Sequence, residues 1–375
     1  LNGAADNDEF GYSVDLNGDG TILAVGTKDI SHNTLVYKYD SGSWSLYGNS
    51  IYQNVVTITT AYTAISASTK PKLNKTGDKL TILSEQHFDD LSGNGQVQSY
   101  QYSASDTSWN YLGNKIESAA YNDISGGDVA VNQAGNIFAV GYPNATGSGA
   151  NSGFTKVYKY DGSWNQLGST INGESAGDYS GTAIAMDGTG DYVAIGSPNA
   201  NSDAGQVQVY QNISDSWTKK GNDIEGSAND NTGRKIAMNA AGDVLVVNSD
   251  SSYGAVSIYQ YDNSWNKLAN NLAAENEGDL INSSIAMDEF GTKITIGEPG
   301  FIDPTASLAD PNAALFWNFA QNTTTSTIGG EVGPAATFRG TVNGVGTDEV
   351  MTVTLTESEG FVTTDDDDEL RATTK

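Results

Sequence analysis

Short runs in which hydrophobic and polar residues alternate recur along the chain, and most of them end in tyrosine. They read LVYKY at 35–39, VQSYQY at 97–102, KVYKY at 156–160, VQVY at 207–210 and VSIYQY at 256–261. Strict alternation with β-branched and aromatic residues predicts strands with one buried face. No stretch of twelve residues shows a clear 3.6-residue periodicity, so the sequence predicts little or no helix.

A pair of short apolar segments joined by a glycine turn precedes each tyrosine run, as in GDVAVNQAGNIFAVG at 127–141. Such pairs predict β-hairpins. The copy at 64–83 is weaker, because its turn is longer and contains Pro71. The turn glycines recur at intervals of 49–58 residues, at positions 20, 77, 135, 190, 242 and 291.

A tryptophan motif with constant spacing follows each tyrosine run. Its copies begin at Trp44, Trp109, Trp164, Trp217 and Trp265, and each has Gly four residues later and Ile three residues after that. Only the last copy departs, with Ala269 and Leu272 in place of Gly and Ile. The motif predicts one outer strand per unit, on which the tryptophan covers the edge of the sheet.

Each unit therefore offers four antiparallel strands, and the sequence predicts an all-β fold: a β-propeller of six or seven four-stranded blades. A solenoid is the structural alternative. The sixth unit differs, because Trp317 stands in register with the tyrosine strands and no tryptophan motif follows it. The predicted propeller covers residues 1–320, with repeats at about 1–51, 52–116, 117–171, 172–224, 225–272 and 273–320.

The last part of the chain has a different composition. Residues 321–334 are rich in Thr and Gly and are predicted to form a linker. Residues 335–363 contain further strand-like segments, which would form either a seventh blade or a small appendage. Residues 364–375 include four consecutive aspartates and are predicted to form a solvated acidic tail.

The first repeat resembles the FG-GAP repeat of integrin-α-type β-propellers. It reads Phe10-Gly11-Tyr12-Ser13-Val14, and the second half of that repeat recurs as VGYP at 140–143, IGSP at 195–198 and IGEP at 296–299. The Phe-Gly pair is present in the first unit alone. The added tryptophan motif is similar to repeats of secreted surface proteins of marine bacteria and algae and of some virion appendages. The resemblance implies a fold and leaves the function open.

The resemblance also implies a candidate calcium site, because the hairpin turns of that family often bind calcium. Asp15, Asn17 and Asp19 match the first three ligands, and Gly20 matches the turn glycine. The ninth position, which should carry a carboxylate, is Leu23. Calcium takes six or more oxygen ligands. Weak calcium binding and a plain turn therefore both remain open, and no other cofactor is expected.

The charge of the chain limits its partners. It has 46 acidic and 18 basic residues, for a net charge of −28, and it has no cysteine. Such a field disfavours nucleic acid and anionic membranes, and no apolar run is long enough to insert into a membrane. The two histidines, His32 and His87, lie in different units and have no metal-ligand spacing.

No catalytic motif stands out from the repeats, so the sequence predicts that the protein is not an enzyme. The leading hypothesis is an extracellular or surface-associated adhesion module, which binds a polysaccharide or a surface protein through propeller loops. A structural subunit of a self-assembling extracellular appendage, such as a filament, sheath, cell-wall layer or virion fibre, is the alternative. A polysaccharide-degrading enzyme is the third hypothesis, since a pair of carboxylates in loops would be hard to recognise in so acidic a chain.

Overall fold

The structure is a computed structural model, and its described residues form six antiparallel β-sheets and one short helical turn. It describes residues 1, 10–28, 33–52, 68–85, 95–119, 123–124, 127–250, 254–268, 272–273, 284–297, 314–318 and 338–341. No helix in these ranges is long and apolar enough to cross a membrane. The all-β class and the four-stranded units predicted from the sequence are confirmed.

The first three sheets share one plan, in which a hairpin is followed by a tyrosine strand and a divided outer strand. The first contains β1 (Ser13–Leu16), β2 (Ile22–Gly26), β3 (Asn33–Asp40), β4 (Ser43–Leu46) and β5 (Ile51–Tyr52). The second contains β6 (Thr69–Leu73), β7 (Lys79–Ser84), β8 (Gln96–Ser103), β9 (Ser108–Tyr111) and β10 (Ile116–Glu117). The third contains β11 (Val129–Val131), β12 (Ile137–Tyr142), β13 (Phe154–Tyr160), β14 (Trp164–Gln166) and β15 (Ile171–Asn172).

The fourth and fifth sheets repeat this plan, and the sixth has four strands. The fourth contains β16 (Ala183–Met186), β17 (Tyr192–Ser197), β18 (Gln206–Ile213), β19 (Ser216–Lys219) and β20 (Ile224–Glu225), with the helical turn α1 (Ala200–Asp203) between β17 and β18. The fifth contains β21 (Ile236–Met238), β22 (Val244–Ser249), β23 (Ala255–Tyr261), β24 (Trp265–Lys267) and β25 (Leu272–Ala273). The sixth contains β26 (Ser284–Met287), β27 (Lys293–Gly297), β28 (Ala314–Asn318) and β29 (Phe338–Thr341).

The glycine of the tryptophan motif divides each outer strand in two. In the third sheet Trp164 pairs with Tyr160 near the end of β13, whereas Ile171 pairs with Thr155 near its start. Between them Gly168 has φ 72°, a left-handed conformation that glycine adopts without steric cost. The constant motif spacing thus sets how the outer edge of each sheet bends.

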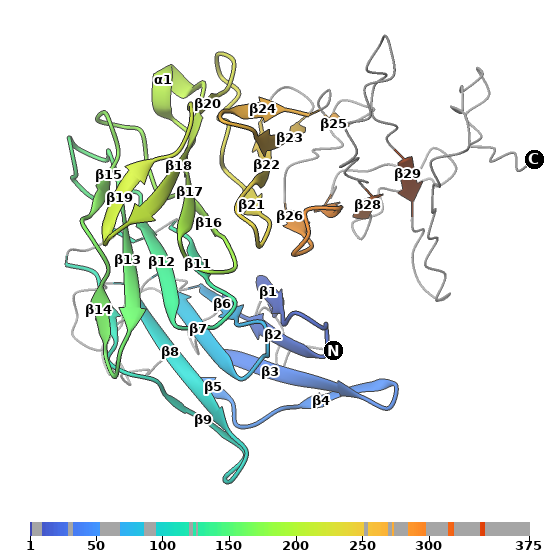
Figure 1. Cartoon of the computed structure of the whole chain (residues 1–375). Helices are drawn as coiled ribbons and strands as arrows, with labels where there is room; N and C mark the ends of the chain where they lie inside the picture. The colour runs from blue at the N-terminus through green and yellow to red at the C-terminus, as the bar shows by residue number, and fades with distance from the viewer. Residues whose placement is uncertain are drawn as a thin grey trace, which may run out of the picture.

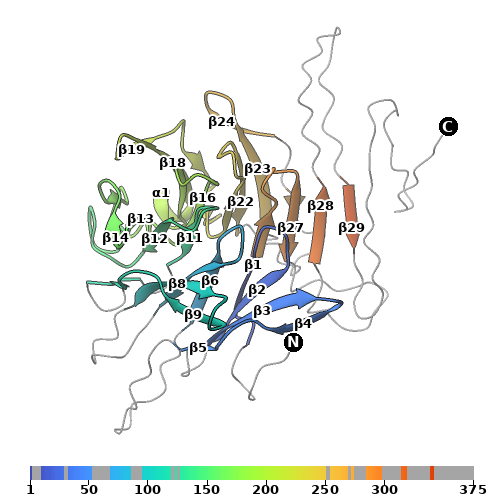
Figure 2. The same ribbon diagram turned by 60° about the horizontal axis from the view of Figure 1, so that its bottom comes forward.

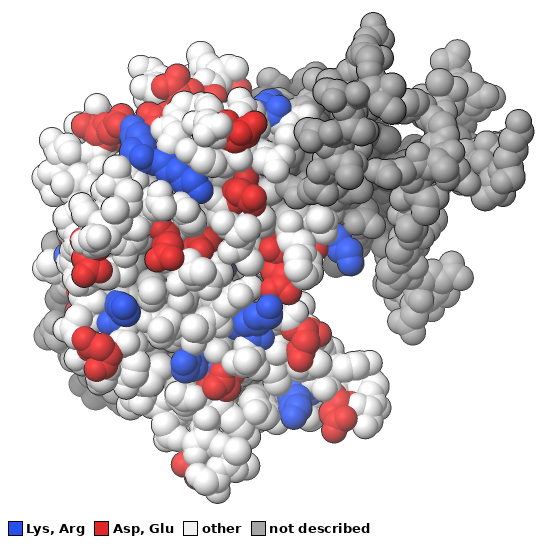
Figure 3. Space-filling view, viewed as in Figure 1, with Lys and Arg blue, Asp and Glu red and all other residues white. Residues whose placement is uncertain are grey.

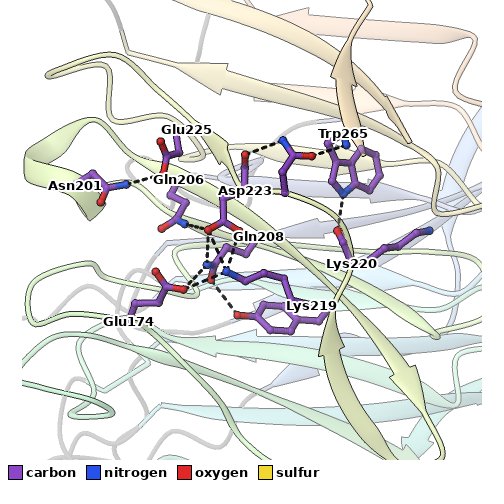
Figure 4. Close-up of polar contacts among 11 residues, drawn as sticks. Glu174, Asn201, Gln206, Gln208, Lys219, Lys220, Asp223, Glu225 and Trp265 are labelled. Carbon is purple, nitrogen blue, oxygen red and sulfur yellow. Dashed lines mark hydrogen bonds and ion pairs between the residues drawn. The ribbon is translucent and has the colours of Figure 1, made fainter. Parts of the chain in front are cut away.

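The tryptophans join consecutive sheets, which is a larger role than the predicted covering of one sheet edge. Each occupies its own sheet, as expected, and in the four sheets after the first its indole Nε1 donates a hydrogen bond to a backbone carbonyl of the preceding sheet. The pairs are Trp109 with Tyr47 at 2.9 Å, Trp164 with Leu112 at 2.8 Å, Trp217 with Leu167 at 2.9 Å and Trp265 with Lys220 at 3.0 Å. Figure 4 shows the last of these contacts.

The hydrophobic core lies between the sheets. Five clusters of buried side chains each combine residues of two consecutive sheets, from the first and second to the fifth and sixth. In the cluster between the second and third sheets, Phe138 is 1 % exposed and stacks with Tyr158. The second hairpin strands are covered on both faces, and every residue of β12 is buried. Apolar residues therefore run continuously along these strands.

The sheets follow one another around a common axis, with β1, β6, β11, β16, β21 and β26 nearest to it (Figure 1). Figure 2 shows β28 and β29 beside β27 at the end of this series. The six described sheets do not close into a complete ring. One face of the first sheet accordingly stays open, and Val14 and Leu16 on β1 are 57 % and 53 % exposed.

The described strands agree with the expectation for the sixth unit. Trp317 lies on β28 and pairs with Ile294, as the tyrosines of other sheets pair with their second hairpin strand. One strand from the predicted C-terminal β segment, β29, is the fourth strand of this sheet. The predicted linker at 321–334 and tail at 364–375 lie outside the described residues, and the predicted repeat boundaries stay predictions.

Candidate functional site

The six hairpin turns have the same internal hydrogen bonds. Each begins with an Asn or Asp whose Oδ1 accepts backbone N–H groups at the far side of the turn. For Asn132 the donors are Asn136 at 3.0 Å and Ile137 at 3.1 Å. The other turns begin with Asn17, Asn74, Asp187, Asn239 and Asp288. The side chain thus replaces water as the partner of the turn backbone.

The residue after each of these turn side chains joins the turn to the next sheet. Backbone N–H groups donate to backbone carbonyls in an unbroken series around the axis: Gly18 to Lys75, Lys75 to Gln133, Gln133 to Gly188, Gly188 to Ala240 and Ala240 to Glu289, at 2.9–3.1 Å. The Glu289 carboxylate of the sixth sheet also accepts from Lys75 Nζ and, at 2.9 Å, from Gln133 Nε2. Side chains from three sheets therefore meet across the axis at the turn end.

The strands nearest the axis carry a second set of converging side chains farther from the turns. The residues two and four places before the Asn or Asp that begins each turn are called positions two and four. They lie on the same face of the strand, because side chains alternate between the two faces. Seven of these twelve positions hold Ala or Ser. The exceptions are charged and are named the axial cluster: Asp15 and Lys72 at position two, and Lys70, Asp128 and Lys235 at position four.

Lys70 is the paired member of the axial cluster. Its Nζ lies 2.7 Å from a carboxylate oxygen of Glu85 and donates a hydrogen bond of 2.7 Å to the carbonyl of Gly127 in the third sheet. Burial opposes its charge, but Glu85 and Asp128 outweigh that effect, so the pKa of Lys70 is raised. This lysine holds the second and third sheets together.

Lys72 and Lys235 differ from Lys70 in their partners. Within the part of the chain that the structure describes, neither ammonium group makes a hydrogen bond or an ion pair. Lys235 is exposed to solvent, yet surrounding protein limits its hydration and lowers the pKa of the ammonium group. Lys70 and Lys72 lower that pKa further by repulsion, although they belong to the second sheet and Lys235 to the fifth. The charges of the second and fifth sheets therefore act on one another near the axis.

The two aspartates of the axial cluster connect neighbouring sheets. Asp15 Oδ2 accepts a hydrogen bond of 2.6 Å from the backbone N–H of Leu73, and Asp128 Oδ2 accepts one of 3.2 Å from Ile184. Burial raises the pKa of Asp15, with Lys72 and the Leu73 N–H acting in the opposite direction. Both carboxylates thus accept hydrogen bonds from backbone N–H groups of the neighbouring sheet.

The residues of the candidate calcium site are placed in two directions. Asn17 Oδ1 accepts hydrogen bonds from Thr21 and Ile22, and Asp19 Oδ1 accepts from the backbone and hydroxyl of Thr21. These bonds lower the pKa of Asp19. Asp15 is directed to the second sheet instead. Asn17 and Asp19 therefore lie together, whereas Asp15 belongs to the axial cluster, and calcium binding stays a prediction.

A second polar group, the lateral cluster, lies between the third and fourth sheets and consists of Glu174, Gln206, Gln208, Lys219 and Asp223 (Figure 4). Lys219 Nζ lies 3.2 Å from Glu174 and 2.9 Å from Asp223. Both glutamines donate to Asp223, at 2.6 and 3.3 Å. Because these groups bind one another, the lateral cluster connects two sheets and offers fewer free donors than Lys72 and Lys235.

The remaining sequence-based candidates add no further site. His32 and His87 lie outside the described residues, and in the described ranges no three His, Cys, Asp or Glu residues are grouped to hold a metal. Acidic and basic side chains are interspersed over the surface seen in Figure 3. The axial cluster was missed from the sequence because a lysine in an alternating strand reads as a solvent-facing residue. Aligning the six hairpins would have shown Lys and Asp where other copies have Ala.

Comparison with known proteins identifies the fold. No family model and no curated sequence matches the chain. A Bacteroides fragilis protein provisionally assigned as a 6-phosphogluconolactonase has a similar structure, with a TM-score of 0.55, 9 % identity and coverage of 90 % of this chain and 84 % of that one. Hydrazine synthase of Kuenenia stuttgartiensis gives a TM-score of 0.54, 10 % identity and coverages of 85 % and 79 %.

A Bacteroides uniformis protein with the same provisional lactonase assignment gives a TM-score of 0.50, 11 % identity and coverages of 85 % and 82 %. At such low identity these similarities establish the fold alone. They confirm the predicted β-propeller architecture with several four-stranded antiparallel sheets.

Proposed function

We propose that the protein is an extracellular binding module that recognises a polysaccharide at the end of the propeller opposite the hairpin turns. The observation that carries this proposal is a difference between the two ends of the axis: polar groups at the turn end bind one another, whereas two lysines farther away do not. At the turn end, Lys75, Gln133 and Glu289 bind one another. Farther from the turns, Lys72 and Lys235 have no such partners among the described residues. Groups available to a ligand therefore lie away from the turns.

Two further features support a binding role. The resemblance of the first repeat to FG-GAP propellers, which belong to surface proteins, agrees with an extracellular location. The charged groups at the axis come from separate sheets and converge on a narrow region, which suits one unit of a sugar chain better than the broad surface of a protein. A surface protein remains the alternative partner.

The experiment is a binding screen of the purified protein against immobilised polysaccharides, followed by titration calorimetry with oligosaccharides of the best one. Binding should weaken in Lys235→Gln and be retained in Lys159→Gln, in which the altered lysine is exposed on β13, away from the inner strands. Failure to bind any polysaccharide, or equal loss in both variants, would count against the proposal.

The open face of the first sheet favours a structural subunit as a second candidate. Val14, Leu16 and Leu46 are 57 %, 53 % and 52 % exposed, whereas a self-assembling protein buries such residues against its neighbour. Sedimentation across a range of concentrations tests this candidate. Assembly that Leu16→Ser abolishes would support it, and a monomer at all concentrations would exclude it.

Hydrolysis of a sugar lactone is a third candidate, because two similar structures carry a provisional lactonase assignment. Lys235, whose pKa burial lowers, is the candidate base that would take a proton from the water that attacks the lactone ester and opens it to an acid. Release of acid from 6-phosphogluconolactone, measured in a pH-stat with wild type and Lys235→Gln, decides this. The same measurement tests the prediction that the chain is not an enzyme.

A further inference from the structure

We infer that the axial cluster binds an anionic group of the ligand, the carboxylate or sulfate of an acidic saccharide, between Lys72 and Lys235. The inference rests on the proposed function for the saccharide class and adds the charge that the ligand must carry. It is unexpected for a chain whose net charge is −28, because most of the surface repels anions.

The first argument is the balance of charge at the axis. Lys70 is neutralised by Glu85 at 2.7 Å, which leaves Lys72 and Lys235 opposite Asp15 and Asp128. Both aspartates already accept backbone hydrogen bonds from a neighbouring sheet. The two lysines, in contrast, have unused donors within the described residues. The groups left to bind a ligand are therefore these two cationic lysines, which favour an anion.

The second argument is repulsion between sheets. Lys70 and Lys72 disfavour the charged form of Lys235, although they belong to the second sheet and Lys235 to the fifth. An anion placed among them offsets this repulsion and favours the charged form of Lys235. Charge-assisted hydrogen bonds to carboxylate or sulfate oxygens are also stronger than bonds to neutral hydroxyls.

The third argument is placement. The charged positions are two and four residues back from the turn, on strands whose other copies carry Ala or Ser there. Ala130, Ala185 and Ala237 hold the equivalent positions in other sheets, so the lysines are the long side chains at these positions. Lys235 is exposed to solvent, so an anion can reach it without unfolding a sheet.

The experiment titrates the protein with three probes of equal length: an oligogalacturonate, a sulfated galactose oligomer and a neutral galactose oligomer. At least one acidic probe should bind roughly tenfold tighter than the neutral one, a difference of about 1.4 kcal/mol, because charge-assisted hydrogen bonds are stronger than bonds to neutral hydroxyls. Lys235→Gln and Lys72→Gln should each weaken it about tenfold. Lys235→Arg should retain binding, and Lys159→Gln should leave it unchanged. Thermal melting confirms that each variant is folded.

The outcomes separate this inference from the proposed function. Equal affinity for acidic and neutral probes, or wild-type affinity in Lys235→Gln, overturns the anion site and leaves the binding module intact. If no oligosaccharide binds, the proposed function fails, and galacturonate and inorganic sulfate are then titrated alone by NMR. Binding of either that Lys235→Gln abolishes supports the anion site. Binding that is insensitive to Lys235 overturns it.

Discussion

A single tryptophan in each repeat from the second to the fifth performs two tasks at the residue scale. Its ring fills the space beside the outer strand, and its Nε1 donates to the carbonyl that precedes the glycine of the previous motif. The glycine is required for the same reason: a Cβ on Gly113 would lie 2.9 Å from Trp164 Cδ1. The motif therefore encodes contacts between consecutive sheets. Its last copy has Ala269, and the sixth unit has no tryptophan at the corresponding position.

Trp164→Phe should reduce stability, because it removes the hydrogen bond of 2.8 Å to Leu112 and leaves a carbonyl without its partner. The expected loss in free energy of unfolding is about 1–2 kcal/mol. Trp44→Phe is the control, since within the described residues the Trp44 indole makes no hydrogen bond to another sheet. Urea unfolding followed by circular dichroism measures both, and equal losses would refute the proposed role of the indole.

Gly113→Ala should destabilise the protein more than Gly20→Ala. Both glycines have positive φ, 74° and 72°, so the backbone strain of a side chain is nearly the same. A Cβ at Gly20 meets nothing within 4 Å, whereas one at Gly113 meets the Trp164 ring. The difference should be about 1–3 kcal/mol in unfolding free energy, the usual cost of overpacking. Equal losses of unfolding free energy in the two variants would contradict this prediction, because they would mean that the Trp164 ring moves aside without cost.

At the scale of the element, the hairpin turn is the unit that brings the sheets to the axis. The side chain of its first residue satisfies the turn internally, and this leaves the next backbone N–H and carbonyl free to join neighbouring turns. The chemistry explains why both Asn and Asp occur at this position, since either one supplies the accepting Oδ1.

Asn132→Ala tests this turn. It removes the acceptor for the N–H groups of Asn136 and Ile137 and the donor to the Thr189 carbonyl of the next sheet. Leaving a buried N–H without a partner costs about 1–3 kcal/mol, so a comparable fall in unfolding free energy is expected. Asn132→Asp keeps the acceptor and should lose less. Thermal and urea melts that rank the two variants in the reverse order would contradict the mechanism.

The sequence was sufficient to predict these elements because each has a local signal. Period-two alternation marks the tyrosine strands, and glycine spacing marks the turns. The axial cluster had no local signal, because Lys72 and Lys235 are far apart in the chain and each lies in an ordinary strand. Their proximity depends on the curvature of the whole propeller. Likewise, the sequence showed that Trp164 recurs but gave no indication that its partner is Leu112 in the preceding repeat.

At the scale of the whole molecule, the chain combines a strongly negative surface with three lysines near its axis. The negative charge keeps the protein apart from other anions, while the axial cluster presents positive charge in a confined place. The six sheets converge there and the turn series joins them. Ligand binding at the axis would therefore link several sheets at once and should stabilise the entire fold.

The last prediction concerns pH and anion affinity. The groups that interact with Lys235 are Asp128 and Glu85, which favour its charge, and Lys70 and Lys72, which oppose it; burial is the largest effect and lowers the pKa below that of an ordinary lysine. An anion binds the charged form better, so binding must take up protons near this pKa. Affinity for the anion should fall as the pH rises through the pKa of Lys235. This fall should occur at a lower pH than the deprotonation of an ordinary lysine.

Lys235→Arg separates this effect from the titration of other groups, because arginine stays protonated throughout this range. In that variant the alkaline fall in affinity for the acidic oligosaccharide should shift upward or disappear, while affinity near neutral pH is kept. Calorimetry in buffers of different ionisation enthalpy measures the protons taken up on binding. Proton uptake should be present in wild type at alkaline pH and reduced in the variant. Identical uptake in both proteins would assign the linkage to another group and remove Lys235 from the anion site.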